Sequence, residues 1–238
     1  MKIKKMRWNA SINWLKKERL NSNMESLSNK RKAIYLISRI AIFGALSLIL
    51  YMVPGLQFGV PFAPSFLKIH LDEIPVLLAG LAYGTPTAIG ILVLKSAFKL
   101  IQDIPETLGI GVLADFLYGC ALIIPATLIY NHNRTFKGML ISILVGLLSN
   151  LVVASFVGLY TIFPLYGLIY GNDTIANMFK VFDKSITSLS DIKIAYEFLL
   201  PFNLLKDGLV IMVVFLIYKP MRILIERIKK WSSKTSFF

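Results

Sequence analysis

The stretch FLKIHLDEIPVLLAGLAYGTPTAIGILVLKSAFKLI, residues 66–101, decides the fold of this chain. It opens with a charged, helix-breaking patch, becomes apolar, breaks at Gly84-Thr85-Pro86, and resumes with Lys95 inside an otherwise apolar run. We predict two short helices, near 73–84 and 86–101, each short for a full membrane span. Ionisable side chains and irregular backbone are tolerated at membrane depth where they line a cavity or are buried in protein. We therefore interpret this stretch as the floor and one wall of a ligand site in a membrane protein.

The composition indicates an all-α integral membrane protein. Of the 238 residues, 56% are hydrophobic and only 16% are charged, with a mean hydropathy of +0.67. A soluble domain has about 45–50% apolar and about 25% charged residues. The 26 basic and 13 acidic residues give a net charge of +13, but the basic residues gather at the ends of hydrophobic runs, where they set topology. No nucleic-acid partner is predicted, and the single Cys120 excludes a disulfide framework.

We predict three parts: a basic cytoplasmic extension (1–32), a six-helix transmembrane domain (33–220) and a basic cytoplasmic tail (221–238). The extension holds ten basic and two acidic residues. It is either a disordered tail that fixes orientation or a segment that lies on an anionic membrane face.

The six predicted membrane spans are residues 33–53, 73–84, 86–101, 109–130, 136–163 and 196–218. Pro164 is expected to close the fifth span, and Pro201-Phe202-Asn203 and Lys206-Asp207-Gly208 to interrupt the sixth. An even number of spans puts both termini on one side. That side has 18 basic and three acidic residues, against five basic and seven acidic in the loops opposite. By the positive-inside rule, both termini are predicted to be cytoplasmic.

The loop of residues 54–72 is rich in proline, glycine and phenylalanine. Phe58, Phe62 and Phe66 supply flat apolar surface. The loop is either a lid over a planar ligand or an interfacial loop whose aromatic rings lie at headgroup level. The lid is favoured, because the loop leads directly into the charged patch.

The sequence offers little for catalysis. His70, interpreted as a polar loop residue, and His132 have no metal-ligand spacing between them. There is no GxxxxGK[ST] loop, nucleophile elbow or HExxH motif, so the chain cannot hydrolyse ATP by the phosphate-loop route. No metal site is predicted.

Polar residues lie inside the predicted spans: Lys95, Asp115, Asn203, Lys206 and Asp207. A charge at the bilayer centre costs at least about 2.5–3.5 kcal/mol, so such residues must pair, snorkel or meet a ligand. Asn203 and Lys206 are three residues apart and share a helix face. Together they are suited to a ligand rich in carbonyls and ring nitrogens. For Lys95, structural pairing and ligand contact both stay open.

Several motifs together resemble a known family. They are FLKIHLDEIPVLLAGLAYGTP (66–86), the in-span Lys95, GVLADFLYG (111–119), Pro164-Leu165-Tyr166 and Pro201-Phe202-Asn203-Leu204-Leu205-Lys206. In this order and spacing they are similar to the riboflavin-type substrate-binding subunits (S components) of energy-coupling factor (ECF) transporters. The resemblance covers about residues 33–220.

The resemblance implies a six-helix S-component bundle that binds a vitamin from outside. It implies docking on a transmembrane coupling subunit driven by two cytoplasmic ATPases, so ATP is used by those partners and this chain has no cofactor. It also implies that Ala41 and Ala45 face the coupling subunit, and that Asn203 and Lys206 contact the flavin ring.

Four further substrate-binding candidates are Phe66, Lys95, Asp115 and Tyr160. The chain departs from the family at Asp115, where an Asn is typical, and at residues 157–160, where an Asn often precedes the Pro-x-Tyr motif. These departures leave room for a relative that binds another vitamin.

Three functions are compared. The first is an S component for riboflavin in the plasma membrane, and the second is the same architecture with another vitamin or precursor. The third is a membrane enzyme that uses Lys95, Asp115 and Lys206. The lack of a nucleophile–base pair or metal set disfavours the enzyme.

Overall fold

A computed structural model of the chain describes residues 2–64, 67–186, 188–189 and 191–235. They fall into two compact units, with the division between Arg39 and Ile40. The first unit is helical from residue 2, and this helix, α1 (Lys2–Met52), continues into the second. The predicted domain boundaries, at residues 32 and 220, stay predictions.

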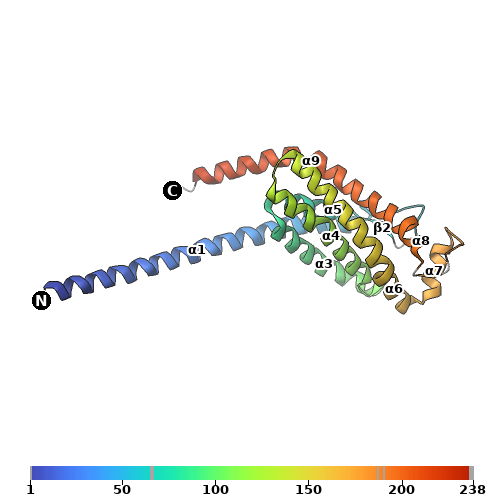
Figure 1. The fold of residues 1–238 in the computed structure, drawn as a ribbon, viewed down its shortest axis with the longest axis horizontal. Helices are drawn as coiled ribbons and strands as arrows, with labels where there is room; N and C mark the ends of the chain where they lie inside the picture. Colours follow the sequence, from blue (N-terminus) through green and yellow to red (C-terminus); the bar gives the residue numbers. More distant parts are fainter. Residues whose placement is uncertain (1, 65–66, 187, 190, 236–238) are drawn as a thin grey trace. The chain divides into compact units, whose positions relative to one another are not determined.

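The second unit is a helical bundle (Figure 1), in which α3, α4, α5 and α9 run side by side and α6 to α8 gather at one end. Its helices after α1 are α2 (Glu73–Tyr83), α3 (Thr85–Thr107), α4 (Ile110–His132), α5 (Phe136–Val157), α6 (Phe163–Tyr170), α7 (Asn172–Lys180), α8 (Ile192–Ile194) and α9 (Leu200–Thr235). One 3₁₀ turn, η1 (Pro54–Leu56), and two π-helical turns, η2 (Gly158–Ile162) and η3 (Ala195–Leu199), complete the helical elements of the described residues.

Both helices predicted from the deciding stretch are present as α2 and α3, but only α2 is short: α3 continues to Thr107 and has 23 residues, so the prediction of a short second helix is wrong. Gly84 joins them with φ 103°, a left-handed conformation that favours glycine, and its N–H donates to the carbonyl of Gly80. Gly80 lies so close to α4 that an added methyl group would be 2.4 Å from Thr127. Because α2 packs this tightly, nearly all of it is buried.

The loop between α1 and α2 is more regular than the sequence suggested. A short antiparallel hairpin, β1 (Phe58–Gly59) and β2 (Lys68–Ile69), pairs Phe58 with Ile69. The rings of Phe58 and Phe62 are exposed. Phe66 lies outside the described residues.

The predicted effects of two prolines are wrong. The helix does not end at Pro164 but runs on through η2 and α6 to Tyr170, and the last helix passes Pro201 without a break. In both places a π-helical turn ends two residues before the proline. There Phe163 N–H donates to Gly158 O, and Leu200 N–H donates to Ala195 O, each across five residues. This wider turn accommodates a proline, which has no N–H and whose ring clashes with the carbonyl four residues earlier in a regular α-helix.

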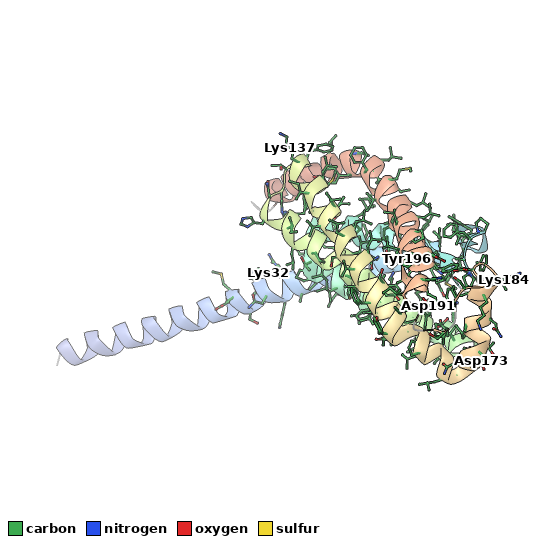
Figure 2. All side chains as sticks on the ribbon, turned by 45° about the vertical axis from the view of Figure 1, so that its right-hand side comes forward. Lys32, Lys137, Asp173, Lys184, Asp191 and Tyr196 are labelled. Atoms are coloured by element: carbon green, nitrogen blue, oxygen red, sulfur yellow. The ribbon has the colours of Figure 1, made fainter. Side chains whose placement is uncertain are left out.

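Within the described residues, four helical stretches are long and apolar enough to cross a membrane: Met24–Met52, Ile110–His132, Phe136–Tyr170 and Ile192–Tyr218. The apolar helix α2 is shorter, and α3 carries buried charges. The count of six transmembrane helices therefore stays a prediction. In the second unit, Lys137 lies at one end, and Asp173 and Lys184 lie toward the other (Figure 2).

Candidate ligand-binding site

A cavity of about 600 Å³ opens within the second unit. Its walls come from the end of α1, the hairpin, α3, α4, the η2–α6 segment and the η3–α9 segment. The lining residues are Tyr51, Met52, Gln57, Leu67, Lys68, His70, Lys99, Ile101, Gln102, Asp103, Thr107, Gly111, Val112, Ala114, Asp115, Tyr118, Ile162, Phe163, Tyr166, Leu199, Phe202, Asn203 and Lys206. Elements distant in sequence thus contribute polar and aromatic groups to one space.

A network of buried ion pairs forms one side of the cavity. Asp72, at the start of α2, accepts from Lys95 Nζ at 2.9 Å and from Lys99 Nζ at 3.1 Å. Asp115 of α4 pairs with Lys99 and lies 3.6 Å from Lys95 Nζ. Ser47 of α1 donates to the Asp72 carbonyl. Because these helices meet at opposite charges that are largely buried, breaking a pair would leave an uncompensated charge, and the network therefore holds the helices together.

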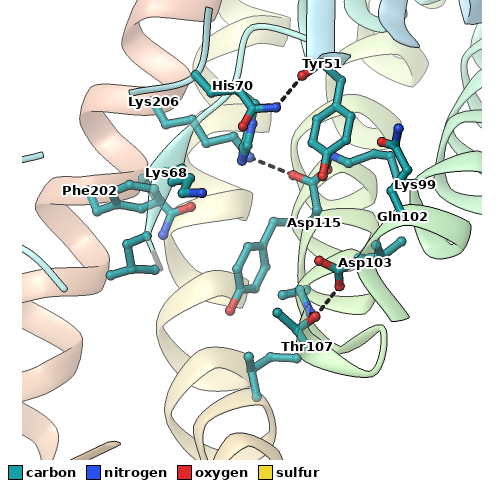
Figure 3. A pocket seen from close by; sticks show the side chains of 18 of the residues that line it. Tyr51, Lys68, His70, Lys99, Gln102, Asp103, Thr107, Asp115, Phe202 and Lys206 are labelled. Carbon is teal, nitrogen blue, oxygen red and sulfur yellow. Dashed lines mark hydrogen bonds and ion pairs between the residues drawn. The ribbon is translucent and has the colours of Figure 1, made fainter. Parts of the chain in front are cut away.

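Lys206 of α9 joins the same network (Figure 3). Its Nζ lies 2.8 Å from Glu73 Oε1 and 3.1 Å from Asp115 Oδ1. An ammonium group has three N–H donors, so two bonds to carboxylates leave one for a ligand. Lys206 is almost fully buried yet lines the cavity, which makes it a group that a bound molecule can reach.

Asn203 lies on the same helix, one turn before Lys206. Its Nδ2 donates to the Leu199 carbonyl at 2.8 Å, which leaves Oδ1 facing away from that bond. Among the described residues, Oδ1 has no partner although it is buried. A buried acceptor without a donor is costly, so this oxygen is suited to a ligand N–H or O–H.

An aromatic and cationic group lies at the end of α1. The rings of Tyr51 and His70 are 5.1 Å apart, and Lys99 Nζ is 3.9 Å from the centre of the Tyr51 ring. Burial, assisted by the positive charge of Lys99, lowers the pKa of His70 to about 4, although Asp115 acts in the opposite direction. His70 is therefore neutral at pH 7 and adds no charge to this wall.

A family model for the substrate-specific component of ECF transporters matches residues 36–218. The chain belongs to this family. The match covers every element from the end of α1 to α9 that lines the cavity. The family consists of transporter subunits, so the S component described here is not an enzyme.

Curated relatives of this S component include three riboflavin transporters. RibU of Staphylococcus aureus is 27% identical over 80% of this chain and 93% of its own length. FmnP of Bacillus subtilis is 26% identical over 75% of this chain and 88% of its own length. RibU of Streptococcus thermophilus is 28% identical over 85% of this chain and 88% of its own length. A solved structure of the S component of a bacterial ECF transporter matches with a TM-score of 0.63. The match covers 81% of this chain and 98% of the solved chain, at 20% sequence identity. This structural similarity shows the fold of the chain.

Only some of the substrate-binding residues predicted from the sequence of this S component lie together in the structure. Asn203, Lys206 and Asp115 line the cavity. Lys95 is fully buried and pairs with Asp72, but it is not among the lining residues. The Tyr160 side chain is 58% exposed and is likewise outside the lining set.

The docking candidates lie elsewhere on the second unit. Ala41 and Ala45 of α1 are exposed, whereas the neighbouring Gly44 is buried and an added methyl group there would be 2.7 Å from Leu94 of α3. The inner side of α1 thus packs through Gly44, which leaves both alanines available to another helix.

Several lining residues were missed by the sequence analysis. Lys99 falls within the predicted span 86–101, but it was counted among the five basic residues of the outer loops and was not proposed as a site residue; it is buried in α3. Its spacing of four from Lys95 could have shown that both ammonium groups share a face. The placement of His70 on the cavity wall had no such signal, since it depends on the hairpin.

Proposed function

We propose that this S component binds riboflavin from the outer side of the membrane and delivers it to an energy-coupling module. Three relatives named as riboflavin transporters support this proposal, since each aligns with 75–85% of the chain. The match includes the helices that carry the cavity.

The observation that carries the proposal is that the side chains of Asn203 and Lys206, one turn apart on α9, both line the cavity. The unpartnered Asn203 Oδ1 would accept from the ring N–H of a flavin, and the third donor of Lys206 would reach a ring carbonyl. Tyr118 and Phe202 add flat apolar surface to the lining. The volume of about 600 Å³ lies within the range of about 300–1,000 Å³ typical of small-molecule sites.

The direct test is titration of the purified protein with riboflavin in mild detergent. We expect saturable quenching of flavin fluorescence at micromolar concentration or below, and a yellow ligand identified by mass spectrometry. Absence of quenching together with a different bound vitamin would reject riboflavin and keep the transporter assignment.

We further propose that the energy-coupling module is a transmembrane coupling subunit with two cytoplasmic ATPases. This chain has no phosphate-binding loop of the GxxxxGK[ST] type, so ATP is used by the partners. Asn203, Lys206 and Asp115 are proposed as substrate contacts. Ala41 and Ala45 are proposed as the face that meets the coupling subunit.

Bulky residues on this face should block coupling without touching the cavity. Ala41→Trp and Ala45→Trp are expected to abolish riboflavin uptake by cells, because close packing of membrane helices requires small side chains. Binding in detergent should stay unchanged, since neither residue lines the cavity. Leu46→Trp is the control, because Leu46 is also exposed but is turned by about 100° from Ala45. Loss of binding together with uptake would show that the alanines support the fold instead.

We propose a plasma-membrane topology of six spans, formed by the four long apolar stretches together with α2 and α3, with both termini in the cytoplasm. The excess of basic residues at the two ends of the chain supports this orientation. In a Cys120→Ala background, an impermeant thiol reagent should label Ser188→Cys, which is exposed in the structure, but not Ser22→Cys, which precedes the first apolar stretch, in intact cells. Equal labelling of the two would contradict the topology.

A further inference from the structure

Three side-chain oxygens converge on one point of the cavity wall, beside Gly111 near the start of α4. A methyl group added at Gly111 would lie 3.3 Å from Asp103 Oδ2, 3.3 Å from the Tyr166 hydroxyl oxygen and 3.4 Å from Thr107 Oγ1. All four residues line the cavity. We call this group, Asp103, Thr107, Gly111 and Tyr166, the oxygen cluster. The absence of a side chain at Gly111 keeps the space in front of the three oxygens open.

The oxygen cluster is held in place by its own hydrogen bonds. The Thr107 hydroxyl donates to Asp103 Oδ2, and the Gly111 N–H donates to Thr107 Oγ1 at 3.3 Å. The turn between α3 and α4 sets this arrangement, since Leu108 and Gly109 both have positive φ, 53° and 84°. The chain therefore reverses directly after Thr107 and brings Gly111 back against Asp103.

The charge of the oxygen cluster differs from that of the ion-pair network. Asp115 has three lysine ammonium groups within 4.0 Å. Asp103, in contrast, pairs with no lysine or arginine of the described residues at that distance. Figure 3 shows the Asp103–Thr107 bond apart from the Asp115–Lys206 pair. The cavity thus has one side, around Lys206, where lysine ammonium groups and carboxylates are paired, and a separate side where the Asp103 carboxylate has no lysine or arginine of the described residues within 4.0 Å.

We infer that the oxygen cluster is a subsite for the polyhydroxyl chain of the ligand and that it disfavours a phosphate on that chain. The inference rests on the proposed binding of riboflavin and names the part of the cavity that selects the form of the vitamin. Ligand hydroxyls donate to the Asp103 carboxylate and to the hydroxyl oxygens of Thr107 and Tyr166. A phosphate ester carries a charge of about −1.5 to −2 at pH 7, so it is repelled by Asp103.

The test compares three flavins that share one ring: riboflavin, riboflavin phosphate, and lumiflavin, in which a methyl group replaces the chain. Gly111→Ala is expected to weaken riboflavin binding roughly tenfold, because the new methyl group occupies the space in front of the oxygens. Lumiflavin should bind this variant as it binds the parent. Alanine is the better helix former, so the variant should fold.

Asp103→Asn removes the charge but keeps a side chain of the same shape. It should raise the affinity for riboflavin phosphate, relative to riboflavin, roughly tenfold. Asp173→Asn, which removes an exposed carboxylate of α7 outside the cavity, is the control and should leave this ratio unchanged.

The outcomes separate the two proposals. Suppose that the parent binds riboflavin. If Gly111→Ala then weakens the binding of riboflavin and of lumiflavin to the same extent, or weakens the binding of neither, the subsite is overturned and the ligand assignment stands. An unchanged phosphate-to-riboflavin ratio in Asp103→Asn overturns the selectivity. If the parent binds none of the three flavins, the proposed function fails and the subsite fails with it.

Discussion

Lys206→Ala is expected to lose at least tenfold to a hundredfold in riboflavin affinity and also to unfold more readily. The loss of one hydrogen bond from a charged donor, about 1.5–3 kcal/mol, accounts for the affinity. The loss of stability has a different cause, because Glu73 and Asp115 would remain buried without their shared ammonium group. Breaking a buried ion pair costs about 3–5 kcal/mol.

A paired substitution separates these two effects. The double variant Glu73→Gln with Lys206→Met removes both charges of the ion pair in which Lys206 Nζ lies 2.8 Å from Glu73 Oε1. Its melting temperature should therefore be higher than that of Lys206→Ala, while its riboflavin affinity stays low. Lys184→Ala, at an exposed loop position, is the control and should match the parent in both measurements. Fluorescence titration and thermal unfolding give the two readouts. A Lys206→Ala protein with the parent's stability and affinity would show that the site is wrongly placed.

Lys95→Met should be destabilised by about 3 kcal/mol, while its folded fraction binds riboflavin like the parent. Lys95 is fully buried and pairs with Asp72 at 2.9 Å, and it is not among the cavity lining. Because Lys99 still neutralises Asp72 from 3.1 Å, we place the cost at the lower end of the range for a broken buried pair. Thermal unfolding measures the cost, and titration of folded protein measures binding.

Asp72→Asn combined with Lys95→Met is the matched control. It removes both charges of the pair, so its stability should lie closer to that of the parent than the stability of Lys95→Met does. If folded Lys95→Met binds riboflavin tenfold more weakly than the folded parent does, Lys95 contacts the ligand and the expectation is wrong.

The sequence predicted the elements that follow from local pattern. The break at Gly84 and the two helices on either side of it were expected because a turn residue divides two apolar runs, although the second helix is longer than predicted. The shared face of Asn203 and Lys206 also follows from helical spacing alone, and the structure places both on the cavity wall.

The parts that were missed depend on tertiary contacts. Asp103 and Tyr166 are 63 positions apart in the sequence. Both lie beside Gly111, because α4 returns beside α3 after the left-handed turn at Leu108 and Gly109 and because α6 also packs against this point. Pro164 was expected to stop a helix, because proline usually does so. The π-helical turn that accommodates it leaves no mark in hydrophobic periodicity.

The two π-helical turns also fix the rotational phase of the helices that follow them. A turn with one additional residue rotates all later side chains by about 100° relative to a continuous α-helix. Without this offset in η3, the face of α9 that carries Lys206 would turn away from Glu73 by that angle. Pro201 prevents the offset from relaxing, because a regular turn would bring its ring against the carbonyl of Glu197. The direction in which the cavity-lining Lys206 points is therefore set by the π-helical turn that ends seven residues before it, which Pro201 prevents from becoming a regular α-helical turn.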